Sequence, residues 1–181
     1  GESRLAIPDM QIAQSGSGAL TFEGRVLANG ALPDGFARGL VLPVSGTYRS
    51  NGDLRLWNAC TRVGFDRLIY ANLELDGRNL TLCPAGGRPI LRYADGRLEL
   101  AAGAPSLDLS GTLAGTPIRL ASGPVGFAWP GQLVARNLDV VLGGTSNAAR
   151  FAITDLEADL GVDIAGEFAD ADIRLDAVPL D

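Results

Sequence analysis

The chain has 181 residues, of which 46% are hydrophobic and only 6% aromatic, and its formal net charge is −6. This composition is too apolar for a disordered chain, and its acidity excludes the Lys/Arg surface needed to bind nucleic acid or an anionic membrane. No stretch approaches the roughly 18 apolar residues of a membrane-spanning helix, and the first ten residues do not resemble a signal peptide. We expect one domain over residues 1–181.

The first third of the chain predicts strands separated by breaks and one long loop. Residues 5–12 contain Pro8 and fit at best an edge strand, whereas residues 20–27 alternate in the manner of a half-buried strand. Asn29-Gly30 indicates a turn or loop. Residues 32–43 hold two prolines and two glycines without alternation, so this segment is predicted to be a loop.

Three dipeptides that tolerate positive φ predict tight hairpins: Asn51-Gly52, Asp76-Gly77 and Asp95-Gly96. They separate short alternating segments, at residues 44–49 and 53–57, 73–75 and 80–82, and 90–93 and 97–101. Residues 63–70 form a further expected strand. The middle of the chain is therefore predicted to be an antiparallel meander.

The second half continues this pattern. The expected strands are residues 107–113, 118–121, 125–129, 133–142, 150–160, 162–168 and 172–175. A helix over residues 147–161 is the alternative for one of them, but Asp155, Glu157 and Asp159 step by two, which favours a strand. About fourteen short strands and no convincing helix indicate an all-β fold.

Most of these strands place an aliphatic residue at every second position, so each has one apolar and one polar face. Such a sheet can close on itself as a β-sandwich, or it can remain an open, curved, U-shaped sheet with an apolar groove. The scarcity of aromatics favours the open form. The expected concave groove residues are Leu56, Leu73, Leu75, Leu80, Leu82, Leu98, Leu100, Leu107, Leu109 and Leu120.

The two cysteines, Cys60 and Cys83, flank the segment that contains residues 63–82. A zinc site is disfavoured because the chain has no histidine and no further cysteine, but two unrelated thiols remain an alternative to a disulfide. A disulfide is favoured because both residues bound one local meander. It would indicate an oxidising compartment.

A search for catalytic and metal-binding residues finds no candidates. The acidic series Asp155, Glu157, Asp159 and Asp163 lacks the spacing of a calcium loop, and a nucleophile triad without histidine is improbable. Trp57 and Trp129 are expected to be packing residues. The sequence thus predicts no enzyme, no cofactor and no metal site.

Around the cysteines the pattern Cys60-x4-Phe65-x2-Leu68, Leu73-x-Leu75, Leu80-x-Leu82-Cys83-Pro84 resembles the YdbH branch of the AsmA-like proteins, relatives of TamB. The resemblance implies a long U-shaped β-sheet (a β-taco) that crosses the periplasm from the inner membrane and carries phospholipid acyl chains in an apolar trough. This chain would be one segment of such a bridge. Its partners would be acyl chains, neighbouring segments of the same groove and an outer-membrane partner, and the parent protein would be anchored in the inner membrane.

Two further hypotheses remain from the sequence. A closed β-sandwich could serve as a non-catalytic adhesion, stalk or envelope-assembly module. A β-helical polysaccharide-active enzyme would require aromatic subsites and a carboxylate pair that the sequence does not present.

Overall fold

The computed structural model describes residues 3–32, 35–162 and 168–177, and this part of the chain is all-β. It contains fifteen strands and no helix that could cross a membrane. The strands are β1 (Arg4–Ala6), β2 (Met10–Gln14), β3 (Leu20–Leu32), β4 (Gly35–Tyr48), β5 (Leu54–Leu56), β6 (Thr61–Tyr70), β7 (Leu73–Pro84), β8 (Leu91–Ala94), β9 (Arg97–Ala104), β10 (Leu107–Leu113), β11 (Thr116–Ser122), β12 (Val125–Trp129), β13 (Gly131–Leu142), β14 (Ala149–Val162) and β15 (Phe168–Ala177).

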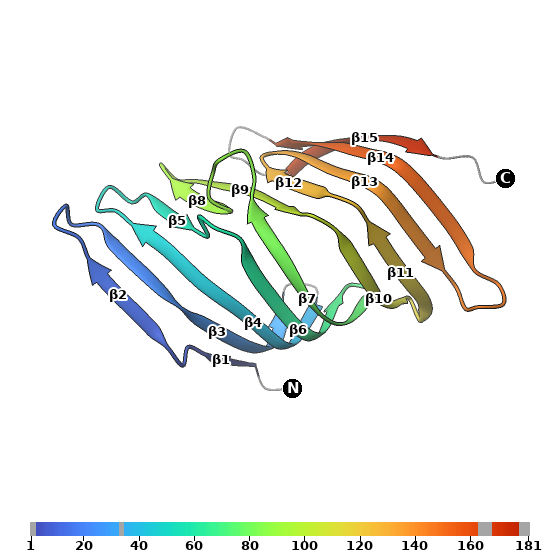
Figure 1. Cartoon of the computed structure of the whole chain (residues 1–181), viewed down its shortest axis with the longest axis horizontal. Helices are drawn as coiled ribbons and strands as arrows, with labels where there is room; N and C mark the ends of the chain where they lie inside the picture. Colours follow the sequence, from blue (N-terminus) through green and yellow to red (C-terminus); the bar gives the residue numbers. More distant parts are fainter. Residues whose placement is uncertain (1–2, 33–34, 163–167, 178–181) are drawn as a thin grey trace.

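All strands belong to one antiparallel sheet. In its middle, two short strands placed end to end span the length that one long strand, such as β4 or β13, spans elsewhere. Along one edge, β4 pairs with β6 through residues 35–41 and with β5 through residues 46–48. At the other end β13 pairs with β12 through residues 133–135 and with β11 through residues 139–142. We call β5, β8, β9 and β12 the upper lane and β6, β7, β10 and β11 the lower lane, after their positions in Figure 1.

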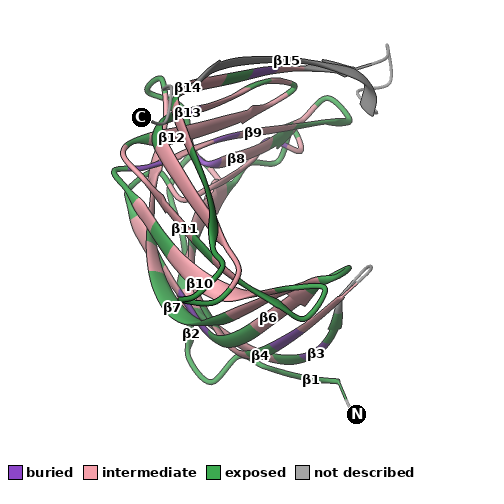
Figure 2. Ribbon diagram, turned by 90° about the vertical axis from the view of Figure 1, so that its right-hand side faces the viewer, coloured by how far each residue is buried: buried purple, intermediate pink, exposed green. Residues whose placement is uncertain are grey.

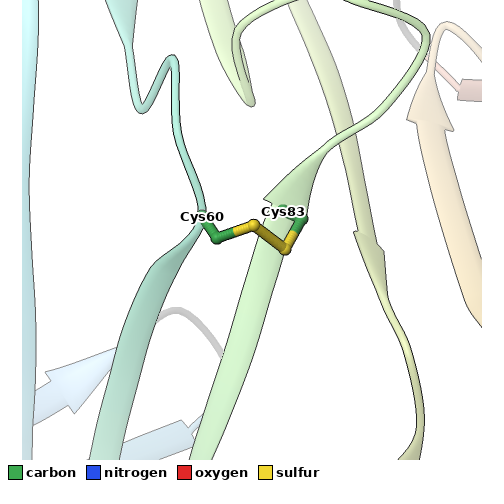
Figure 3. Close-up of a disulfide and its surroundings, with 2 residues drawn as sticks. All are labelled: Cys60 and Cys83. Atoms are coloured by element: carbon green, nitrogen blue, oxygen red, sulfur yellow. A yellow bond between two sulfur atoms is a disulfide. The ribbon is translucent and has the colours of Figure 1, made fainter.

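The two lanes meet at a seam, where the end of β7 pairs with the end of β9 through Cys83 opposite Gly103 and Pro84 opposite Ala102. Cys60 lies where the chain crosses from β5 to β6, and it forms a disulfide with Cys83 (Figure 3). The predicted disulfide is therefore confirmed. It links the first two of the four places where the chain passes from one lane to the other, between β5 and β6 and between β7 and β8.

The sheet curls into an open C, with β12, β13 and β14 on one arm, β7, β10 and β11 along the back, and β3, β4 and β6 on the other arm (Figure 2). In the described part of the chain, β15 pairs only with β14, and β1 and β2 pair only with β3, so the sheet is not closed into a barrel. The open curved sheet is confirmed, and the closed sandwich is not the fold observed.

Much of the chain remains in contact with water. Its accessible surface is 11506 Å² for a mass of 18.8 kDa. A compact monomer of that mass exposes roughly 8,300 Å². No large side chain of the described residues is fully buried. The excess surface is what a single curved layer without a second layer over it would show.

The loop predicted for residues 32–43 is wrong for the described residues, because residue 32 ends β3 and residues 35–43 belong to β4, while residues 33 and 34 lie outside the described part. The described proline and glycines of this stretch occupy tolerant positions in a long strand. Pro43, which has no N–H, lies where β4 changes partner from β6 to β5. Its carbonyl accepts the indole N–H of Trp57 at 2.6 Å. Asn29-Gly30, predicted as a turn, lies within β3.

The hairpin predicted at Asp76-Gly77 is also wrong. β7 runs without interruption through this dipeptide, and the reversal before it lies at Ala71 and Asn72, with Ala71 at φ 50°. The turns predicted at Asn51-Gly52 and Asp95-Gly96 are confirmed. At the latter both residues have positive φ, as a type I′ turn requires. The helical alternative for residues 147–161 is excluded, because β14 covers residues 149–162, and residues 163–167 of the last predicted strands lie outside the described part.

Candidate functional site

The register of the upper lane places its aliphatic residues on one face of the sheet, because residues directly opposite each other in antiparallel strands project to the same side. Two rows of opposed residues cross this lane. They are Tyr48, Leu54, Tyr93 and Leu98 in the outer row, and Gly46, Leu56, Leu91, Leu100 and Trp129 in the next.

The lower lane has equivalent rows. Leu120 lies opposite both Leu109 and Val140. Another row joins Ala37, Leu68, Leu75, Gly111, Ile118 and Leu142. Leu73 lies two residues before Leu75, and Leu107 two residues before Leu109, so both share this face.

A bulge in β4, whose shift is passed on through β6, keeps the two halves of β7 on the same face. In β4 one extra residue lies opposite β3, because Ala28 pairs with Leu40 whereas Gly30 pairs with Ala37, with Gly39 at φ 60° between them. The registers of β4 with β6 and of β6 with β7 transmit this shift to the Asp76-Gly77 position. Leu75 and Leu80, five residues apart, therefore face the same side.

A second irregularity does the same in β13. Ala135 belongs to the face of the upper lane through Val125, and Leu138 belongs to the face of the lower lane through Val140. Asn137, at φ 49°, absorbs the odd spacing where β13 passes the seam. Opposite it, β14 shifts register against β15 between Ile153 and Asp155.

The result is one continuous apolar face that carries all ten predicted leucines. The sequence reasoning missed further members, which the registers add: Phe22, Val26, Leu40, Leu42, Phe65, Leu68, Ile118, Phe127, Leu133, Leu138, Val140, Leu142, Phe151 and Ile153. Arg78 lies opposite Phe65, so the register places one cation on this face as well. Leu40 and Leu42 of β4 lay in the segment interpreted as a loop, where the bulge at Gly39 hid their alternation. Phe22 and Val26 of β3 lay in the strand predicted for residues 20–27 but were not counted among the groove residues.

Side chains on this apolar face are mostly half-buried by one another, and its outermost members are exposed, as at Leu5 (69%), Ile12 (68%) and Phe151 (54%). A hollow of about 270 Å³ lies between β1, β3 and β4, lined in part by Leu5, Ala28 and Leu40 of this face. The apolar face is thus accessible to solvent, and its surface is uneven, with a hollow at one end.

The opposite face of the sheet carries ion pairs. Arg150 donates to Asp139 at 2.7 Å and 3.0 Å, Arg136 pairs with Asp155, and Arg119 lies 3.4 Å from Asp108. The Arg150 guanidinium holds the pKa of Asp139 below its usual range, mainly through this hydrogen bond. These charged residues belong to the polar face, and Asp155, one of the acids considered for calcium, is among them.

The calcium hypothesis gains no support. Asp155 is paired with Arg136, and Asp159 accepts a hydrogen bond from Gln132. No cluster of three or more potential metal ligands occurs in residues 3–32, 35–162 and 168–177, and Asp163 lies outside them. A second hollow of about 440 Å³ is lined by polar residues, among them Gln11, Thr21 and Glu23, together with Ile12 and Phe22.

One carboxylate of the polar face is buried. Asp53, only 5% exposed, accepts from Arg55 at 2.9 Å and 3.1 Å and from Arg92 at 3.4 Å, and Arg49 lies 3.5 Å away. The hydrogen bond from Arg55 is the largest influence that lowers the pKa of Asp53. Three arginines therefore converge on one acid beside the turn between β4 and β5.

Comparison with known proteins gives one match. A family model described as YdbH-like, intermembrane phospholipid transport protein YdbH, matches residues 2–181. No curated protein and no solved structure gave a significant match.

Proposed function

The chain belongs to the YdbH-like family of intermembrane phospholipid transport proteins, and from this premise we propose that its apolar face carries phospholipid acyl chains along the curved sheet. The chain would then act as one segment of a longer lipid-conducting groove in the periplasm. The observation that carries the proposal is a continuous aliphatic face with no second layer of the described structure over it.

The apolar face is best taken as the inner face of the C. Side chains converge on the inner side of a curved sheet and diverge on the outer side, so inner residues shield one another. Arg119 (66%), Arg150 (62%) and Arg136 (59%) have strongly exposed side chains on the polar face. The aliphatic rows between the rims are less exposed, which supports this assignment.

A face of this kind suits transport better than tight binding. Burial of each methylene contributes about 0.8 kcal/mol and has no preferred direction. A row of similar Leu, Val and Ile side chains offers an acyl chain nearly equal positions along the groove, so it can move without breaking a specific contact. No covalent chemistry is needed for this activity, and the family is one of transporters.

The first prediction tests the acyl path with Leu82→Asp. Leu82 lies on the apolar face near the seam, so an ionised carboxylate there would lie among acyl chains and would cost several kcal/mol unless it reached water. We expect the variant to stay folded by circular dichroism and to lose most of the lipid that co-purifies with, or is captured by, the wild-type chain.

Thr81→Asp is the matched control. It adds the same charge one residue away, on the exposed polar face and opposite Arg62. We expect normal lipid capture from it. If a folded Leu82→Asp protein bound as much lipid as the wild type, the proposed path would be wrong. If Leu82→Asp unfolded while Thr81→Asp stayed folded, the apolar face would be a packed core rather than a groove.

A further inference from the structure

The apolar face ends at two rims, which are the two ends of its strands. The upper rim lies beside the turns at residues 50–52 and 95–96, and the lower rim beside the turns at residues 71–72 and 114–115. All three tyrosines of the chain lie in the outermost apolar rows: Tyr48 (43% exposed) and Tyr93 (45%) at the upper rim, and Tyr70 (59%) at the lower. A tyrosine presents an apolar ring and a polar tip, which suits a boundary between hydrocarbon and water.

The two rims differ in charge on the polar side of the sheet. At the upper rim the row behind the tyrosines is Thr47, Arg55, Arg92 and Glu99. Arg49 and Arg97, which alternate with Tyr48 and Leu98, lie further out beside the turns. Four arginines thus face three acids, Asp53, Glu99 and the turn residue Asp95, in a chain whose net charge is −6.

The equivalent row at the lower rim is almost uncharged. It consists of Phe36, Ile69, Glu74, Thr112 and Pro117. Its one charge is negative, and Arg67 of the next row neutralises it. Within the described residues, the outermost polar row is therefore cationic only at the upper rim, and the arginines of the lower lane, Arg38, Arg67 and Arg119, lie one row further from its edge.

The Asp53 cluster gives the upper rim its fixed shape. Asp53 is buried and holds Arg55 through two hydrogen bonds to one oxygen, while Arg92 bridges Asp53 and Glu99. The side chains of Arg49, Arg55 and Arg92 are nonetheless 52%, 35% and 36% exposed. Three guanidinium groups with two acids retain an excess positive charge and outward N–H donors, which is the chemistry that recognises phosphate oxygens.

We propose that the upper rim is a phosphate-recognition site, at which the phosphodiester of a lipid whose tails lie on the apolar face meets Arg49, Arg97 and the Asp53-anchored arginines. This inference rests on the proposed function for the tails and adds the orientation of the bound lipid across the sheet. Head groups lie over the rim formed by β4, β5, β8 and β9, and the rim formed by β6, β7, β10 and β11 contributes contacts to tails only.

The test compares two lipids with identical tails. Vesicles containing equal amounts of dioleoylphosphatidylglycerol and dioleoylglycerol are incubated with the purified chain, and captured lipid is quantified by mass spectrometry. We expect the wild type to prefer the phosphate-bearing lipid. Arg49→Gln with Arg97→Gln should reduce that preference roughly fivefold, as expected for two exposed charge contacts, with dioleoylglycerol capture unchanged. The single change Arg97→Gln, which leaves the Asp53 cluster intact, should give a smaller loss in the same direction.

The control variant Arg119→Gln with Arg150→Gln makes the same charge change on the polar face away from this rim and should keep the wild-type preference. An Arg49/Arg97 variant with undiminished preference overturns the site. If the wild-type chain captured neither lipid, the acyl path itself would be overturned. A third arm adds inorganic phosphate: if it binds the wild type but leaves lipid selection unchanged, the rim binds a free anion and the head-group assignment fails.

Discussion

At the residue scale, the most constrained side chain is Asp53, because it is the one buried acid of the described chain and three arginines surround it. A buried carboxylate is tolerated only when it is paired and hydrogen-bonded. Asn51 adds a local restraint, since its side-chain oxygen accepts the backbone N–H of Asp53 at 3.1 Å. The turn between β4 and β5 therefore has a polar anchor rather than an apolar one.

This anchor predicts a pH dependence of stability. The folded pKa of Asp53 is lowered, chiefly by Arg55, so its contribution is present above the unfolded pKa of about 3.9 and is lost as the pH falls through the folded value. Asp53→Asn should lower the Tm at pH 7, and the difference from wild type should shrink below about pH 4. Thermal unfolding followed by circular dichroism across this pH range measures it.

Asp108→Asn provides the comparison, because Asp108 is 53% exposed in its ion pairs and such pairs contribute little. Its Tm should stay close to that of the wild type at both pH values. A Tm difference for Asp53→Asn that did not change between pH 7 and pH 3 would contradict the ionised anchor.

At the element scale, the bulges are what allow long strands to keep one apolar face. β7 has aliphatic residues at odd positions before Gly77 and at even positions after it. Without a bulge Leu73 and Leu75 would face away from Leu80 and Leu82. The dipeptide Asp76-Gly77 was predicted to form a hairpin turn. In the structure it lies where β7 changes the parity of its apolar positions, in register with the irregularity of β4 and β6.

Gly77 is therefore expected to resist substitution. A Cβ at this position would lie 2.9 Å from the carbonyl oxygen of Asp66 and 3.1 Å from that of Phe65, both backbone atoms that cannot move aside cheaply. Gly77→Val should destabilise the chain by about 1–3 kcal/mol in urea unfolding.

Gly16→Ala is the appropriate control for this substitution, since nothing lies within 4 Å of the added Cβ. It should leave the urea midpoint nearly unchanged. Equal stability of the Gly77→Val protein would show that the close approach of β6 and β7 at this point is not maintained.

At the scale of the whole molecule, the sheet is unusual because its middle is two lanes joined at a seam. The direct pairing of β7 with β9 is short, through Cys83 and Pro84. The disulfide from Cys60 to Cys83 and the hydrogen bond from Trp57 to Pro43 add covalent and polar links near the same line. The seam thus compensates for the missing second layer that holds most sheets together.

Removal of the disulfide should therefore cost stability at this scale. The double variant Cys60→Ser with Cys83→Ser removes a cross-link between cysteines 23 residues apart in the sequence. The chain-entropy estimate for a loop of this length is a loss of about 3 kcal/mol of unfolding free energy. Urea unfolding of the oxidised wild type and the double variant measures the loss. Titration of the denatured, unreduced wild type should return no free thiol, and two thiols would contradict the bridge.

The sequence by itself determined the all-β class and the apolar character of the face, and it favoured the cysteine pairing that the structure then established. Alternation with period two and turn dipeptides such as Asp95-Gly96 depend on local backbone preferences, which the sequence displays directly. Only the tertiary structure decided that residues 35–43 form a strand, that β7 continues through Asp76-Gly77, and that β4 and β13 each pair with two lanes. The physical reason is that a strand's register is set by its neighbours: the same Gly, Asn and Pro residues end an isolated strand, but partners on both sides supply the hydrogen bonds that carry a long strand past them.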